Sequence, residues 1–366
     1  MSTPSEAKQR EFAHTMSEIL NHGALNLAMG VGYRLGLFDV LCRLAAPASV
    51  SQIAEAAALD PRYIREWLGV MTCGRIVELS HDTNGEDLFF LPPEHAAFLT
   101  RDSSSNMGVY TQELPLLAQS AYDAVAAAFA TGEGVGYERY PDFQAFMAQL
   151  ADAKHEQTLL TTFLPSVAQG AIQDRLHYGI RVCDVGCGRG TAVLLMAEAF
   201  PRSTFVGLDI DSATVDLARN TAAARGLTNV RFVCRDAAVL EDAADWQDCF
   251  DYVTAFDAIH DQPHPDHALR GVRHMLAPNG VFSLVDIAAE SDLAGNQVHP
   301  MGPFLYTVSL MHCMPVGLVG NGAGLGMMWG RQTALRMLET AGFTQVTVRE
   351  IPEDPFNHHF ECRSPS

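Results

Sequence analysis

The spacing of apolar residues divides the chain into two parts. Between about residues 11 and 165 apolar residues recur every three or four positions, which predicts helices with one buried face. From about residue 178 short apolar runs alternate with helical stretches, and the runs cover residues 181–185, 204–210, 230–235, 250–256 and 280–287. This alternation predicts a parallel sheet joined by right-handed crossovers. Two last runs, 345–351 and 358–362, have no helix between them, so we expect an antiparallel pair at one edge of the sheet.

The N-terminal part contains one compact pattern. Residues 51–59, 60–68 and 76–79 read as helix, turn, helix and strand, which is typical of a winged helix. A DNA-reading helix needs basic side chains, but Arg62 and Arg65 are offset by Asp60 and Glu66. We therefore expect this part to pack against a second subunit, through the apolar run 25–41, rather than to bind DNA.

A long insertion, residues 288–330, follows the fifth apolar run. Its second half is rich in glycine, and residues 300–314 are almost free of charge. Structureless loops of this length inside a domain usually have a function, and an uncharged surface of this size is poorly tolerated in water. The pattern predicts a lid-like loop that forms a buried wall of a substrate site.

The most informative motif is a glycine turn between a buried strand and a helix. Gly186, Gly188 and Gly190 follow the pattern G-x-G-x-G, and Thr191 stands where a dinucleotide-binding turn has its third glycine. A pyrophosphate binder uses such a turn to neutralise an anion. Here Asp184 ends the strand, and a carboxylate at that place suits a cationic ligand. S-Adenosylmethionine, which carries a sulfonium and an ammonium group, fits better than NAD.

Carboxylates also follow the next two strands. Asp209 is expected to hold the ribose hydroxyls, although Asp211 competes for that role and otherwise caps the next helix. Asp236 is placed to accept a hydrogen bond from the adenine amine, while the neighbouring Ala237 backbone meets a ring nitrogen. Three carboxylates after three successive strands make S-adenosylmethionine the expected cofactor.

The fourth strand ends in residues 257–261, where the group that acts on the methyl acceptor should lie. His260 is the candidate general base, because its ordinary pKa suits proton transfer near neutral pH, and Asp261 stands beside it. A metal site on His260, Asp261, His264 and His267 is the alternative. Prolines 263 and 265 interrupt any regular ligand face, so no metal is expected, and His264 and His267 are assigned to the start of the next helix.

Composition narrows the classes of partner. The formal net charge of −19 disfavours nucleic acid and anionic membranes. The chain is 48% hydrophobic but has no apolar run that would span a bilayer and no secretion signal. Its eight cysteines form no C-x-x-C pair and are expected to be reduced, mostly in the core. We expect a cytoplasmic protein.

Residues 257–261 resemble the histidine-aspartate motif of plant caffeate-type and bacterial hydroxyneurosporene-type O-methyltransferases, and residues 36–41 and 143–147 are similar to the dimerisation domain and linker helix of that group. Residues 94–97, 254–261, 302–306 and 322–326 are also similar to a subgroup of bacterial and animal winged-helix methyltransferases whose acceptors are largely unassigned. The resemblance implies an α/β fold, with a seven-stranded class I methyltransferase (Rossmann-like) sheet behind a mainly helical winged-helix domain.

The same resemblance implies domains and roles. A winged-helix dimerisation domain is expected at 1–100, a helical linker that contributes to the substrate pocket at 101–165, and a cofactor-binding domain with the insertion at 166–366. The implied catalytic residues are His260 and Asp261. The implied cofactor-binding residues are Asp184, Gly186, Gly188, Gly190, Asp209, Asp236, Ala237 and Asp257. Gln262 and Pro263 replace a tryptophan-containing segment of the plant enzymes, so the carboxylate that orients His260 is not identified.

The expected acceptor is a small organic molecule. Its pocket is expected to be lined by these side chains: Tyr140, Phe143, Met147, Phe304, Tyr306 and His312, with Met311 and Cys313 nearby. Methylation of oxygen is the leading hypothesis. A small-thiol S-methyltransferase that relies on positioning, N-methylation, a ligand-sensing winged-helix regulator and an NAD-dependent oxidoreductase are the alternatives.

Overall fold

The structure, a computed structural model, describes residues 5–352 and 354–364. Contacts between residues divide the chain into two compact units, Met1–Gln119 and Ser120–Ser366. The helix α6 (Glu113–Thr131) spans the boundary between them.

The first unit is a winged helix preceded by a long helix. Its elements are α1 (Glu6–Leu35), α2 (Leu37–Leu44), α3 (Val50–Ala57), α4 (Pro61–Cys73), β1 (Glu78–His81), β2 (Asp87–Phe90), α5 (Pro93–Leu99) and the 3-10 turn η1 (Gly108–Gln112). Local sequence explains the starts of α3 and α4, because Ser49 forms a capping box with Gln52 and Asp60 caps the helix that begins at Pro61. The predicted winged-helix pattern is confirmed.

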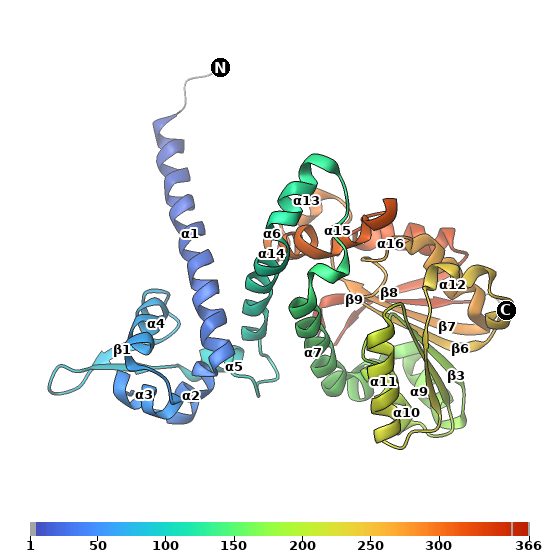
Figure 1. Ribbon diagram of the computed structural model, residues 1–366, viewed down its shortest axis with the longest axis horizontal. Helices are drawn as coiled ribbons and strands as arrows, with labels where there is room; N and C mark the ends of the chain where they lie inside the picture. The colour runs from blue at the N-terminus through green and yellow to red at the C-terminus, as the bar shows by residue number, and fades with distance from the viewer. Residues whose placement is uncertain (1–4, 353, 365–366) are drawn as a thin grey trace. The chain divides into compact units, whose positions relative to one another are not determined.

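The core of this unit leaves half of α1 uncovered. Trp67 donates a hydrogen bond from Nε1 to the carbonyl of Ala28, and Leu25 and Met29 pack against the winged-helix core. The residues of α1 before Leu25 are all exposed, and α1 extends away from the other elements of its unit (Figure 1). No single described helix has the length and apolarity to cross a bilayer; α1 and α2 reach that threshold only as a pair, which is bent by 71°.

The second unit is built on a seven-stranded sheet. The strands are β3 (Arg181–Val185), β4 (Thr204–Asp209), β5 (Val230–Cys234), β6 (Phe250–Phe256), β7 (Leu276–Ile287), β8 (Gln345–Ile351) and β9 (Asp354–Arg363). Their order is β5-β4-β3-β6-β7-β9-β8, parallel except for β9, which pairs antiparallel with both neighbours. The predicted α/β sheet and its antiparallel terminal pair are confirmed. Because the strand order reverses between β3 and β6, the carboxyl ends of these strands form the usual ligand-binding edge.

Helices cover both faces of this sheet (Figure 1). Those between the strands are α10 (Thr191–Ala199), α11 (Ser212–Ala224), η5 (Ala237–Asp242), η6 (Ala244–Trp246), α12 (Pro265–Met275) and α16 (Gly330–Thr340). Before the sheet come η2 (Tyr137–Arg139), α7 (Pro141–Thr158), the π-helical turn η3 (Leu159–Phe163), α8 (Leu164–Ser166), η4 (Val167–Gly170) and α9 (Ala171–Tyr178). Two apolar cores lie on the two faces of the strands.

The insertion after β7 differs from the expected structureless loop. It folds into α13 (Leu293–Asn296), α14 (Gly302–Val308), the π-helical turn η7 (Ser309–Cys313), α15 (Met314–Gly317) and η8 (Val319–Asn321). The expectation of a loop was wrong because the apolar residues of 302–317 occupy every side of these short helices and so show no amphipathic period. Their burial was expected correctly, since Leu305, Val308, Cys313 and Val316 are all buried.

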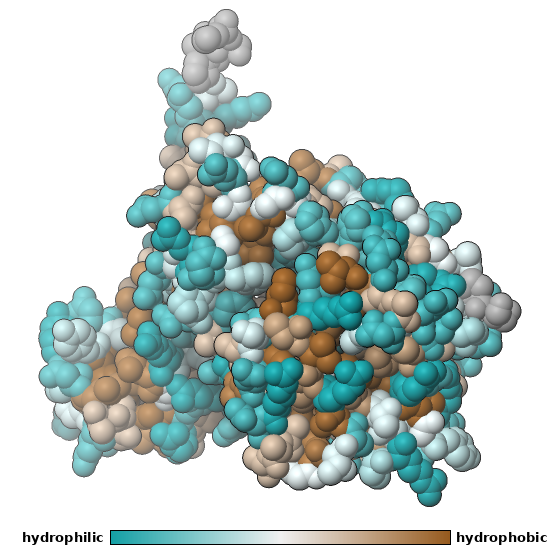
Figure 2. Space-filling model, turned by 45° about the vertical axis from the view of Figure 1, so that its right-hand side comes forward, coloured by the Kyte–Doolittle hydropathy of each residue, from teal (hydrophilic) through white to brown (hydrophobic). Residues whose placement is uncertain are grey.

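The eight cysteines are free thiols, but they are not mostly core residues as the sequence suggested. Cys183, Cys313 and Cys362 are buried, and the other five are exposed or half-buried. The surface in Figure 2 mixes hydrophilic side chains with apolar patches. This acidic chain therefore still exposes apolar side chains, and some of its thiols are also exposed to solvent.

Candidate functional site

The glycine turn after β3 has the backbone that its sequence requires. Gly186, Gly188 and Gly190 all have positive φ values, of 71°, 53° and 78°. A Cβ atom on Gly190 would lie 2.4 Å from the Phe232 ring, whereas one on Gly188 would meet no atom within 4 Å. Gly188 therefore faces open space at the carboxyl edge of the sheet, and its neighbours are held tightly against the fold.

Asp184 lies underneath this turn. The register of β3 and β6 places Asp184 opposite Thr254, whose Oγ1 donates to the carboxylate at 2.6 Å. Burial, together with the charge of the nearby Asp209 and against the lowering effect of the Thr254 hydrogen bond, raises the pKa of Asp184 to about 7. A buried carboxyl of this kind gains most from a positive ligand, because a cation stabilises its ionised form.

Asp209, Asp211 and Asp236 end the neighbouring strands or cap the helices that follow. Asp209 accepts hydrogen bonds from the backbone N–H of Gly188 at 2.8 Å and of Asp211 at 3.0 Å. Asp211 caps α11 through Ala213 and Thr214, which confirms the helix-capping interpretation of that residue. Asp236 caps η5 through the N–H of Ala238, and the Ala237 that follows it is buried.

Asp257 is the fourth carboxylate along this edge. Its φ of 49° lies in the left-handed region, and its two carboxylate oxygens accept from Asn357 Nδ2 at 2.7 and 2.9 Å. Lys154 of α7 lies 4.0 Å from the same carboxylate and 2.6 Å from Asp354. Asp184, Asp209, Asp236 and Asp257 thus lie at or just after the carboxyl ends of β3, β4, β5 and β6, and Asp209 also contacts Gly188. A ligand with two positively charged groups is attracted by these four carboxylates.

His260 lies in the loop after β6 and is 4% exposed. Its Nδ1 lies 2.8 Å from Oδ1 of Asp286, which is the last but one residue of β7 and is fully buried. Burial alone lowers the pKa of His260, but the Asp286 carboxylate outweighs it and raises the pKa well above its ordinary value. This pair can accept a proton at Nε2 and hold it as an imidazolium.

Asp286 is the orienting carboxylate that sequence reasoning did not identify. Its Oδ1 also accepts hydrogen bonds from Trp329 Nε1 at 3.1 Å and from its neighbour Ile287 N at 2.8 Å, while its Oδ2 has no hydrogen-bond partner. One signal in the sequence could have found it. Residues 281–289 are apolar except for Ser283 and Asp286, and a charge inside such a strand needs a partner.

Asp261 and part of the predicted acceptor wall lie around the same histidine. Asp261 accepts a hydrogen bond from the hydroxyl of Tyr137. His312, on η7, is ringed by Tyr137, Tyr140 and Phe143, with centroid separations of 5.9, 4.8 and 4.8 Å. Burial, and then the charge of His260, lower the pKa of His312 to about 3, so this ring is neutral.

Other residues that were assigned to that wall have the following surroundings. Phe304 and Tyr306 belong to a different apolar cluster, with Ile287, Leu305 and Met328. The hydroxyl of Tyr306 accepts a hydrogen bond from Asn296. Met147 is half-buried on α7. His264 and His267 lie at the start of α12, as expected; the side chain of His264 makes no capping hydrogen bond, and His267 contacts Glu241. Among the described residues, no group of three or more histidine, cysteine and acidic side chains is arranged to hold a metal ion.

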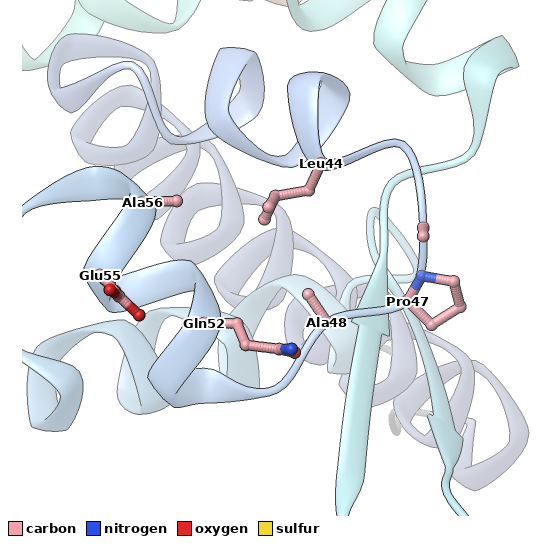
Figure 3. A pocket seen from close by; sticks show the side chains of 7 residues that line it. Leu44, Pro47, Ala48, Gln52, Glu55 and Ala56 are labelled. Carbon is pink, nitrogen blue, oxygen red and sulfur yellow. The ribbon is translucent and has the colours of Figure 1, made fainter.

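A separate pocket of about 420 Å³ lies in the first unit. It is lined by the end of α2, residues 46–48 and one face of α3, as Figure 3 shows. The side chains of Leu44, Ala48 and Ala56 are apolar, and Gln52 and Glu55 are the polar groups. None of these residues belongs to the predicted catalytic set.

Comparison with known proteins identifies two domains. Residues 176–342 match the family model of a methyltransferase domain, and residues 23–101 match that of an Rv2258c-like winged HTH domain. The resemblance inferred from the sequence is therefore confirmed. A methyltransferase domain of this fold takes S-adenosylmethionine as its methyl donor, so the expected cofactor is confirmed as well.

Solved structures with the same fold span the whole chain. Human N-acetylserotonin methyltransferase in complex with SAM is 14% identical, covers 100% of both chains and has a TM-score of 0.64. Mitomycin 7-O-methyltransferase is 17% identical, covers 98% of this chain and 100% of its own, and has a TM-score of 0.66. At these identities the likeness establishes the fold alone.

Curated relatives match a shorter segment. A tRNA (guanine-N(7)-)-methyltransferase from Aeromonas hydrophila is 38% identical over 111 residues, which are 28% of this chain and 47% of the relative. The chain thus spans about half the length of the curated relatives it matches.

Proposed function

Since the chain carries a class I methyltransferase domain behind a winged HTH domain, we propose that it transfers a methyl group from S-adenosylmethionine to the hydroxyl oxygen of a small organic molecule. The observation that carries this proposal is the buried His260–Asp286 pair, with 2.8 Å between Nδ1 and Oδ1, next to the carboxylate edge. Because Nδ1 is engaged by Asp286, Nε2 is the atom that can take the acceptor proton.

The residues of the carboxylate edge hold the cofactor. Asp209 takes the ribose hydroxyls, Asp236 and the Ala237 backbone take the adenine, and the glycine turn allows close approach of the methionine part. Asp184 and Asp257 supply negative charge for its cationic groups. When bound, S-adenosylmethionine supplies an electrophilic methyl group on a sulfonium, which leaves as the neutral thioether when the methyl group is transferred.

His260 performs the proton chemistry. As the new bond forms between the acceptor oxygen and the methyl carbon, the hydroxyl proton passes to Nε2. The Asp286 carboxylate stabilises the imidazolium that results, which is the physical meaning of the raised pKa of His260. This complete base arrangement favours an oxygen acceptor over a thiol, because a thiolate is nucleophilic enough to react by positioning alone.

The acceptor is proposed to be a small, uncharged aromatic compound. The support is the set of rings around the neutral His312, formed by Tyr137, Tyr140 and Phe143, whose faces and edges suit a planar ring. Although some relatives methylate tRNA, we do not propose tRNA as the acceptor of this chain, because a net charge of −19 repels a phosphate backbone. On α4, the positive charge of Arg62 is paired with Glu66.

A panel of phenols, small thiols and amines tests the proposal through the production of S-adenosylhomocysteine. We expect turnover of at least one phenol by the native protein and a large loss in His260→Ala, with S-adenosylmethionine affinity retained in calorimetry. Turnover restricted to thiols, or an unchanged rate in His260→Ala, would overturn the role of His260 as a base for oxygen.

A further inference from the structure

The carboxylate of Asp257 shares a lysine with a second carboxylate. Both oxygens of Asp257 accept from Nδ2 of Asn357, at 2.7 and 2.9 Å, and Nζ of Lys154 lies 4.0 Å from Oδ2. The same ammonium group lies 2.6 Å from Oδ2 of Asp354, which is buried. One positive charge on α7 is thus divided between the carboxyl edge of the sheet and the start of β9.

Asp257 is held in place and is open to a ligand. Its side chain is 41% exposed, although both oxygens are hydrogen-bonded. A Cβ atom on Gly186 would lie 2.5 Å from Cβ of Ala258, so the residue after Asp257 packs directly against the glycine turn. The left-handed φ of Asp257 is unfavourable outside glycine, and such strained residues recur at functional sites. Asp257 is therefore an ordered, accessible carboxylate beside the cofactor-binding turn.

Lysine is rare in this chain. Of its 24 lysines and arginines, only Lys8 and Lys154 are lysines. An ammonium group is a compact point charge on a flexible stem, so it can move between two carboxylates more easily than the planar fork of an arginine can. The next residue, His155, packs its ring against Phe256 with a centroid separation of 4.7 Å, and Phe256 precedes Asp257. This packing keeps Lys154 beside the carboxylate.

We propose that Lys154 is a specificity-determining residue that acts through Asp257: its ammonium group is the counter-ion of this carboxylate and competes with the positive charge of the methyl donor. S-Adenosylmethionine has a sulfonium charge that S-adenosylhomocysteine lacks. After methyl transfer the site therefore loses a positive charge, and Lys154 leaves Asp257 paired beside the neutral thioether. This inference deepens the proposed function, because it rests on the assignment of Asp257 to the cationic groups of the cofactor.

The charges that face Lys154 give the direction of the effect. Burial lowers the pKa of Lys154, but Asp257 and Asp354 outweigh it and raise that pKa above its ordinary value, so the group is charged. At pH 8.5, about four pH units above the ordinary pKa of an aspartate, Asp257 is ionised with or without the lysine. Loss of the ammonium group then removes a repulsion from a sulfonium and none from a neutral sulfur. Because the amino-acid part is common to both ligands, the ratio of their affinities isolates the charge on sulfur.

Calorimetry of the full-length protein at pH 8.5 measures both affinities without an acceptor. In Lys154→Met the ratio of S-adenosylmethionine to S-adenosylhomocysteine affinity should rise about threefold or more, and Lys154→Arg, which keeps the charge, should restore the native ratio. In Asp354→Asn the ratio should fall, because the ammonium group then pairs with Asp257 alone. Lys8→Met is the matched control and should leave the ratio unchanged. General damage to the fold would weaken both ligands together and would not move the ratio in opposite directions.

A native ratio in Lys154→Met, or a rise in Asp354→Asn, would overturn the inference. The variant Asp257→Asn separates this failure from a failure of the proposed cofactor site. If Asp257→Asn lowers the ratio while Lys154→Met leaves it unchanged, Asp257 keeps its place in the proposed function and only the role of Lys154 fails. If Asp257→Asn also leaves the ratio unchanged, the assignment of Asp257 to the cofactor's charge fails, and the inference fails with it.

Discussion

Asp286 decides what His260 can do. The carboxylate is fully buried and accepts through Oδ1 from His260, Trp329 and its own neighbour Ile287. This fixes the ring so that Nδ1 donates and Nε2 stays available. Without such a partner, a buried imidazole would lose its affinity for a proton, as the neutral His312 does beside it.

Asp286→Asn tests this directly. The amide keeps the shape but removes the charge that stabilises the imidazolium, and it favours the wrong ring tautomer. We expect kcat to fall by about 10³–10⁴-fold, the effect known when a catalytic histidine loses its orienting carboxylate to an amide. Trp329→Phe, which removes one donor but no charge, is the matched control and should cost far less. A kcat of Asp286→Asn within tenfold of the native value would contradict the role of the pair.

The affinity for S-adenosylmethionine should depend on the ionisation of Asp184. Its pKa is about 7 because of burial, so the carboxyl is largely protonated below that pH. A cationic ligand binds the ionised form better, so binding should weaken as pH falls through 7, by at most about tenfold per pH unit for one linked proton. Calorimetry between pH 5.5 and 8.5 measures this. In Asp184→Asn the dependence should disappear; a native affinity that is flat across this range would contradict it.

At the scale of elements, the turn after β3 requires glycine for two different reasons, a left-handed backbone and close packing. Gly188 and Gly190 both have positive φ, but only Gly190 would place a Cβ against Phe232, at 2.4 Å. Gly188→Ala should cost about 1–2 kcal/mol of unfolding free energy for the left-handed backbone alone. Gly190→Ala adds a steric clash in a packed core, which costs about 1–3 kcal/mol more. Denaturant unfolding of the two variants compares them, and equal losses would contradict this packing explanation.

Elements with a strong period were predictable, and those without one were not. The strand and helix alternation after residue 178 indicated the sheet, its order of elements and the carboxylates at its edge, because each strand end follows from a local pattern. The helices of 288–330 were not predicted, because apolar residues lie on every side of them and leave no amphipathic period in the sequence. The pairing of His260 with Asp286 depends on packing between segments distant in sequence, so the pair has no local signature.

At the scale of the whole molecule, α1 exposes apolar side chains that no other part of the same chain covers. Its exposed apolar residues recur at helical spacing and form one stripe: Phe12, Met16, Ile19, Leu20, Leu27, Val31 and Leu35. An isolated helix is marginal in water and gains most of its stability from packing an apolar face. The sequence had indicated the run 25–41 as the surface for a second subunit, but Leu37, Phe38 and Leu41 of that run are buried in the winged-helix core. The exposed stripe of α1 is the surface that stays available for a second subunit.

The apolar stripe of α1 predicts a homodimer in solution. Ile19 and Leu20 are 56% and 68% exposed in the single chain, and burying each against a second copy contributes about 1.5–3 kcal/mol. The double variant Ile19→Glu, Leu20→Glu places charges in that interface and should yield monomers, whereas Glu18→Gln, beside them, should not. Sedimentation velocity at micromolar concentrations measures the masses. Because the substitutions lie outside the second unit, the thermal unfolding of the methyltransferase domain should change little. A native protein that sediments as a monomer would contradict the predicted homodimer.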